Sequence, residues 1–236
     1  MSEGATPMAA EAPERLETRL SRVDGQAGEL VIGGYRLEDL APNAAFEETA
    51  FLLWHDRRPD AAELEALRGR LARGRAVPAP TRLILEQAAS ARLPVMDALR
   101  LAVDSLALAG IGESVGVTSA ESLVAILPAV VAAYWRLLHR QEPLTAPEDL
   151  PHAASYLFLL TGERPAEAAV RGLETYLNTV IDHGLNASTY TARVIAGTRS
   201  DMVSCVVGAL GALKGPLHGG APGPAFEMVY DILERV

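Results

Sequence analysis

The sequence has little cysteine, few aromatic residues and no excess of positive charge. Its only cysteine is Cys205, so no disulfide can form within the chain, which fits a reducing compartment. Cys205 lies in the apolar run 203–210, where we expect it to be a small buried hydrophobe. A net charge of -9 at pH 7 argues against nucleic acid as a partner, because nucleic-acid recognition usually leaves a basic surface.

The sequence also lacks a clear targeting segment or membrane span. Residues 1–15 begin with small and acidic residues and have no cationic start, so we interpret them as a disordered tail rather than a signal peptide. The longest apolar stretch, 122–138, is interrupted by Pro128 and falls short of the roughly 20 residues that span a bilayer. The sequence therefore predicts a soluble, cytoplasmic protein without membrane contact.

The residue pattern predicts an all-α fold with a small N-terminal β-hairpin. Aromatic residues make up only 5% of the chain, so Ala, Leu and Val must fill most of the core, and Ala and Leu favour helices. A hairpin is expected within residues 19–37, where Asp24-Gly25 signals a turn. From residue 40 onward apolar residues recur every three or four positions, which predicts roughly eight to ten helices and no parallel sheet.

The helix boundaries follow from capping residues, glycines and prolines. Asn43 is expected to cap the first long helix, and Pro128 is expected to kink or break a later one. Residues 189–213 are apolar on nearly every side, which indicates a central helix or a subunit interface, and small residues such as Gly208 would allow close helix approach. The other helices are expected over 46–54, 61–73, 83–91, 96–109, 120–138, 152–161 and 166–181.

Two of the five histidines lie in unusual segments between apolar helices. His183 lies among Asp, Asn, Ser and Thr in residues 182–189, and it would share a face with Asn186 if this segment were helical. Here a functional site and a polar helix junction are equally good interpretations. His218 lies among four glycines and two prolines in residues 214–223, and because glycine lets backbone approach a ligand, a functional loop is favoured over a simple helix stop.

The remaining histidines, His55, His139 and His152, lie at expected helix ends and are interpreted as structural or surface residues. Two distant histidines and one cysteine do not make a zinc site, so no metal is predicted. The motifs of serine hydrolases, dinucleotide-binding folds and phosphate-binding loops are absent from the sequence.

At the two histidine segments the sequence resembles the citrate synthase family, which includes the 2-methylcitrate synthases. The resemblance runs along nearly the whole chain from about residue 16. Its most specific parts are DHGLNASTYTARVIAG, residues 182–197, and GALKGPLHGGAPG, residues 211–223. Gly184 and Pro222 stand where the family more often has Glu and Asn, although both also occur in family members.

The resemblance implies that the enzyme removes a methyl proton from acetyl-CoA, adds the enol to oxaloacetate, and hydrolyses the thioester to give citrate and CoA. By its match to the family motif, His218 is expected to donate to the enolate oxygen, where charge develops. His183 is expected to bind and polarise oxaloacetate, with Asn186 and Ser188 close by, and Ser188 is expected to orient the His218 ring. The expected acyl-CoA contacts flank His218: Leu217, Gly219 and Gly220.

The resemblance further implies a homodimer with oxaloacetate and acyl-CoA as substrates and with no permanently bound cofactor. It predicts a helical large domain over residues 16–220 and the start of a small domain over 221–236. The family's catalytic aspartate, a third histidine and the carboxylate-binding arginines match positions beyond Val236, so the chain alone is expected to be incomplete and inactive.

Other functions remain open on the sequence. A 2-methylcitrate synthase would use propionyl-CoA, and a citryl-CoA lyase-like enzyme would share the same broad family. A non-catalytic helical dimerisation or binding module would keep the fold and act through a partner chain.

Overall fold

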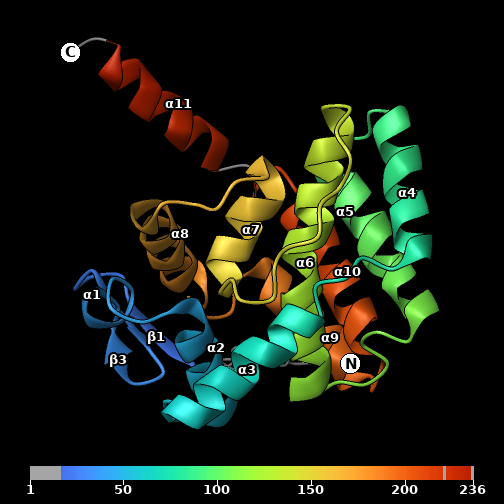
Figure 1. Cartoon of the computed structure of the whole chain (residues 1–236). Helices are drawn as coiled ribbons and strands as arrows, with labels where there is room; N and C mark the ends of the chain where they lie inside the picture. The colour runs from blue at the N-terminus through green and yellow to red at the C-terminus, as the bar shows by residue number, and fades with distance from the viewer. Residues whose placement is uncertain (1–16, 220–221, 235–236) are drawn as a thin grey trace, which may run out of the picture.

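The computed structural model describes residues 17–219 and 222–234, and this part of the chain is built almost entirely of helices (Figure 1). Eleven α-helices in the described residues follow a small N-terminal sheet, and one 3-10 helix covers Ser105–Ala109. The predicted all-α fold with an N-terminal hairpin is therefore confirmed. The predicted disordered tail, residues 1–15, lies outside the described residues.

The sheet consists of three short antiparallel strands: β1 (Ser21–Asp24), β2 (Glu29–Ile32) and β3 (Tyr35–Arg36). The first two form the predicted hairpin, and Ser21 pairs with Ile32 across it. The carboxylate of Asp24 accepts the backbone N–H groups of Gln26 and Ala27, which stabilises the turn. The third strand, which the sequence did not signal, pairs with β2.

The helices lie close to their predicted positions, and those at 61–73 and 152–161 coincide with them. The helix predicted over 83–91 begins four residues earlier because Pro80 lies in its first turn, where a missing N–H costs nothing. The helices are α1 (Leu37–Leu40), α2 (Phe46–His55), α3 (Ala61–Arg73), α4 (Ala79–Ser90), α5 (Val95–Asp104), α6 (Val117–Leu138), α7 (His152–Thr161), α8 (Glu167–Val180), α9 (Ala187–Gly197), α10 (Met202–Leu213) and α11 (Pro222–Leu233).

The cap expected at Asn43 and the break expected as one possibility at Pro128 are both absent. Asn43 does not cap α2, because its amide donates to the carbonyl of Asp39 at 3.0 Å, while the carboxylate of Glu48 accepts the N–H of Ala45 at the helix start. Pro128 does not break α6, which continues through it. Proline removes one helical hydrogen bond, and burial of the neighbouring turns against other helices compensates for that loss.

The helix α6 is the centre of the fold, and α3, α4, α5 and α7 pack around it (Figure 1). It has 22 residues and is apolar enough to cross a membrane by length and composition, so the argument that this stretch is too short is wrong. Half of its most apolar window is buried inside the protein, as in the core helix of a globular domain. Its apolar character is therefore explained by helix packing.

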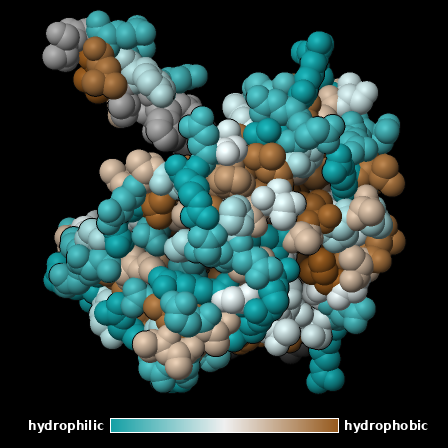
Figure 2. All heavy atoms as spheres, in the orientation of Figure 1, coloured by the Kyte–Doolittle hydropathy of each residue, from teal (hydrophilic) through white to brown (hydrophobic). Residues whose placement is uncertain are grey.

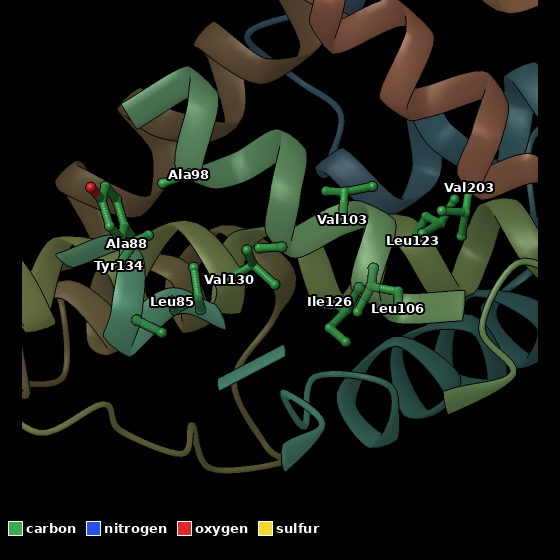
Figure 3. Close-up of a cluster of buried hydrophobic side chains, with 12 residues drawn as sticks. Leu85, Ala88, Ala98, Val103, Leu106, Leu123, Ile126, Val130, Tyr134 and Val203 are labelled. Atoms are coloured by element: carbon green, nitrogen blue, oxygen red, sulfur yellow. The ribbon is translucent and has the colours of Figure 1, made fainter. Parts of the chain in front are cut away.

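The main hydrophobic core lies between α4, α5, α6 and α10 (Figure 3). Its side chains are mostly aliphatic, as the low aromatic content predicts, and Tyr134 is the one aromatic residue in it. The phenol of Tyr134 donates to the carbonyl of Leu93 at 2.5 Å, which satisfies its polar group in the core. Aliphatic members of the cluster include Leu85, Val103, Leu106, Ile126, Val130 and Val203.

Truncation of this core is expected to cost several times more than truncation on the surface of the same helix. Leu85→Ala should lower the free energy of unfolding by about 3 kcal/mol, because Leu85 is fully buried and a cavity would remain. Leu83 lies on the same helix but is 61% exposed, so Leu83→Ala should change the free energy of unfolding by less than about 0.5 kcal/mol. Denaturant unfolding of both variants measures the difference, and equal losses would contradict this core assignment.

The segment 189–213 forms two helices, α9 and α10, which separate where the Asp201 carboxylate accepts the N–H of Ser204 at 2.7 Å. They pack closely, because a β-carbon at Gly208 would lie 2.3 Å from the side chain of Ile195. Within the described residues α9 has no buried residue and α10 has only Val203 and Cys205. Burial of Cys205 is as predicted, and it raises the pKa of the thiol. Of the two helices, only α10 contributes to the main core, through Val203.

A buried polar contact connects α2 to the start of α7. His152 is 4% exposed, and its ring stacks on that of Phe46 with centroids 4.6 Å apart. The backbone N–H of His152 donates to the carboxylate of Glu47 at 2.8 Å. Burial, and then the nearby positive charge of Arg75, lower the pKa of His152 to about 4. This buried environment agrees with the structural role predicted for His152.

Acidification is expected to destabilise the protein through His152. The pKa is about 4 in the folded state, whereas the ordinary value for histidine is 6.5, so the unfolded chain binds more protons between these values. The free energy of unfolding should therefore fall as the pH drops from 6.5 towards 4, with a contribution of about 3 kcal/mol from this histidine. Urea unfolding from pH 7 to pH 4 should show a smaller fall in His152→Phe, and an equal fall in both proteins would contradict this assignment.

Candidate active site

The residues between α8 and α9 form a loop, and this loop carries His183. The helix expected around His183 is not formed, because α8 ends at Val180 and α9 begins at Ala187. Asn186 instead caps α9, since its side-chain oxygen Oδ1 accepts the N–H of Thr189 at 2.9 Å. The loop still brings the predicted pair together, with Asn186 Nδ2 at 3.2 Å from His183 Nε2.

This cap determines the tautomer of His183. Because the Oδ1 of Asn186 accepts from the backbone, its Nδ2 is the end that faces the imidazole. An amide nitrogen can only donate, so Nε2 of His183 accepts and the proton of the neutral ring lies on Nδ1. His183 is exposed, and this Nδ1–H is available to an acceptor on a ligand.

His218 lies in a turn that follows α10. The N–H of His218 donates to the carbonyl of Gly215 at 3.0 Å, and the N–H of Gly219 donates to the carbonyl of Leu213 at 2.9 Å. These bonds close the turn and leave the His218 ring half-buried against the start of α9. Its Nε2 lies 2.9 Å from the hydroxyl of Ser188 and accepts the backbone N–H of Ser188 at 3.3 Å.

Ser188 connects the two histidines. Its hydroxyl lies 2.8 Å from Asn186 Oδ1 and 2.9 Å from His218 Nε2, but it has only one proton to donate. The backbone N–H of Ser188 donates to the same Nε2, so Nε2 is an acceptor and the proton of a singly protonated ring lies on Nδ1, which is free to donate to a ligand. The hydroxyl proton of Ser188 has two competing acceptors, Asn186 Oδ1 and His218 Nε2.

Both histidines line one cavity of about 240 Å³. This volume suits a small molecule, since pockets for larger organic ligands measure about 300–1,000 Å³. Among the described residues its only carboxylate is that of Asp182, and no arginine or lysine lines it. The lining residues are Val180, Ile181, Asp182, His183, Gly184, Asn186, Ser188, Thr189, Leu213 and His218.

The structure brings together four of the predicted site residues. Two others lie beside the cavity, and one lies outside the described residues. The four lie in the cavity as one hydrogen-bonded array: His183, Asn186, Ser188 and His218. Leu217 is fully exposed beside the array, and Gly219 is exposed with its N–H already used by the turn. Gly220 lies outside the described residues.

Sequence reasoning missed the contribution of the N-terminal hairpin to this site. The hydroxyl of Ser21 on β1 donates to Oδ1 of Asp182, and the two residues are 161 positions apart. No local pattern signals such a contact, because it depends on how the hairpin packs against the loop.

Comparison with known proteins identifies relatives along most of the chain. The family model described as "Citrate synthase, C-terminal domain" matches residues 11–235. A citrate synthase of Haloferax volcanii is 38% identical over 226 residues, covering 92% of this chain and 59% of its own length. A 2-methylcitrate synthase of Shewanella oneidensis is 36% identical over 222 residues, covering 93% of this chain and 59% of its own length.

A solved structure shares the fold. The citrate synthase of Thermoplasma acidophilum, in a ternary complex with carboxymethyl coenzyme A and oxaloacetate, superimposes with a TM-score of 0.81 at 28% identity. The match covers 89% of this chain and 56% of that one. The chain thus spans less than two thirds of the length of these relatives.

Proposed function

Since this chain belongs to the citrate synthase family, we propose that it carries the two-histidine part of the active site of an enzyme that condenses an acyl-CoA with oxaloacetate. The observation that supports this most is the hydrogen-bonded array of His183, Asn186, Ser188 and His218 in one cavity. The array offers two imidazoles as donors at opposite ends.

The proposed chemistry assigns one donor to each substrate. His218 donates from Nδ1 to the thioester oxygen of the acyl-CoA as the enolate forms, and the hydroxyl of Ser188 donates to Nε2 on the other side of the ring. His183 donates from Nδ1 to an oxygen of oxaloacetate, and Asn186 fixes that tautomer. The exposed Leu217 and Gly219 are proposed to contact the acyl-CoA beside His218.

Removal of the methyl proton also requires a base. The only carboxylate among the described residues of the cavity belongs to Asp182, and its Oδ1 already accepts from Ser21 and from the N–H of Gly184. We therefore propose that these 236 residues, taken alone, turn over slowly at best.

The residues of this site do not distinguish between acetyl-CoA and propionyl-CoA as the acyl substrate. Relatives named for citrate and for 2-methylcitrate synthesis are similarly close, so acetyl-CoA is proposed first and propionyl-CoA second. Thiol release with oxaloacetate and each acyl-CoA, measured on the protein as the cell produces it, distinguishes the two. Absence of release with both would overturn the condensing role and favour a non-catalytic binding module.

A homodimer formed through α5, α9 and α10 is the proposed assembly, in the cytoplasm. Figure 2 shows hydrophobic side chains gathered on the side of the molecule where α5 and α10 lie in Figure 1. Fewer hydrophobic side chains are visible around the hairpin. Leu101 on α5 and Tyr190 and Val194 on α9 are all exposed in the single chain. Exposed apolar side chains that gather on one side of a molecule are typical of an interface.

Sedimentation is expected to show this 25.0 kDa chain as a dimer. Val194→Asp should produce a monomer, because an unpaired charge would be buried at the interface. Leu83→Asp, at an exposed leucine of α4, should leave the dimer intact. A monomeric wild type, or dimers in both variants, would contradict the proposed interface.

A further inference from the structure

The loop that carries His183 has open space on both sides. One side faces the cavity of about 240 Å³ that contains the histidine array. The other side faces a cavity of about 620 Å³, bordered by residues 17–20 and by Arg193 of α9. Asp182, Gly184 and Thr189 line both cavities. The loop is therefore thin, and few packing contacts can determine where His183 lies.

A polar contact from the hairpin compensates for this lack of packing. Asp182 Oδ1 accepts the hydroxyl proton of Ser21 and also the N–H of Gly184, at 3.1 Å. The second bond closes a turn around His183, because Asp182 and Gly184 are its two neighbours in the chain. Gly184 has a φ of 91°, a conformation that glycine adopts readily.

The hairpin itself is firmly attached to the body of the protein. Ser21 pairs with Ile32, which is fully buried in a cluster with residues of α1 and α2. Ile181, the first residue of the loop, packs against the same cluster. The hairpin thus contacts the loop in two ways, through the apolar side chain of Ile181 and through the bond from Ser21 to Asp182.

We infer that Ser21 and Asp182 are positioning residues for His183, so that the N-terminal hairpin determines where the oxaloacetate-binding histidine lies. This inference rests on the proposed function for the identity of the ligand, but not for the structural role of the hairpin. A hydrogen-bonded residue behind a catalytic group typically acts by restricting its orientation, and small displacements of such groups lower rates strongly.

Hydrogen exchange of the Gly184 amide tests the structural role without any need for turnover. In Ser21→Ala this amide should exchange about tenfold faster, because Asp182 loses the bond that fixes its carboxylate. Ser21→Thr keeps the hydroxyl and should exchange like the wild type. The matched control is Ser122→Ala, which removes an exposed hydroxyl from α6. Unchanged exchange in Ser21→Ala would overturn the inference.

Kinetics of the protein as the cell produces it test the link to the substrate. Ser21→Ala should raise KM for oxaloacetate about tenfold while KM for the acyl-CoA stays within about twofold, and Ser21→Thr should restore the wild-type value. A KM for oxaloacetate that does not change in Ser21→Ala would overturn the positioning role. Faster Gly184 exchange in a protein whose wild type shows no turnover would support the role of the hairpin and overturn the proposed function alone.

Discussion

His218→Ala is expected to lower kcat about a thousandfold, with little change in KM for oxaloacetate. The variant removes the donor that we place at the enolate oxygen, and loss of one such donor typically costs about 10²–10³ in rate. His183 and Asn186 keep their contact with each other, so the oxaloacetate end of the cavity is preserved. The fold should also survive, because the His218 ring contacts only Ser188 through hydrogen bonds.

Thiol release by the protein as the cell produces it measures this effect. His139→Ala is the control, since His139 is exposed at the end of α6 and its ring contacts the carbonyl and the indole of Trp135 in the preceding turn. A turnover rate in His218→Ala equal to that of the wild type would show that His218 has no catalytic role. A drop of the same size in His139→Ala would instead indicate a general loss of active protein.

Helix positions could be predicted because they depend on local sequence. The bounds of α3 match the prediction to the residue, since Asp60 and Glu63 form a reciprocal cap that local spacing reveals. A break, one of the two outcomes predicted at Pro128, does not occur, because burial of the surrounding helix outweighs a local penalty. The prediction fails at Asn43, where a neighbouring carbonyl competes successfully for the side chain.

The candidate site could be predicted from its motifs but not from its geometry. His183 and His218 are 35 positions apart, and only the packing of α9 against α10 brings their loops together. The cap at Asn186, which fixes the tautomer of His183, required coordinates because Asn, Ser and Thr in this segment could each have capped a helix. Ser21 gave no signal at all, since its partner lies in a different part of the chain.

Replacement of Asn186 should separate two roles that one side chain performs. Asn186→Ala removes the cap of α9, which should lower the free energy of unfolding by about 1 kcal/mol. It also removes the amide that donates to His183 Nε2, so the ring can change tautomer and withdraw its Nδ1–H from oxaloacetate. An incorrect tautomer can be very costly in catalysis, and we expect kcat/KM for oxaloacetate to fall about a hundredfold.

Asn186→Ser distinguishes these roles, because serine caps a helix as well as asparagine but has no amide nitrogen to reach His183. The free energy of unfolding of this variant, measured with denaturant, should equal the wild-type value, while kcat/KM for oxaloacetate should remain low. If Asn186 acts through His183, then His183→Ala should cause a similar loss, and the double variant should lose little more than either single one. Additive losses would show that Asn186 contacts the substrate independently, and recovery of activity in Asn186→Ser would show that the cap alone organises the site.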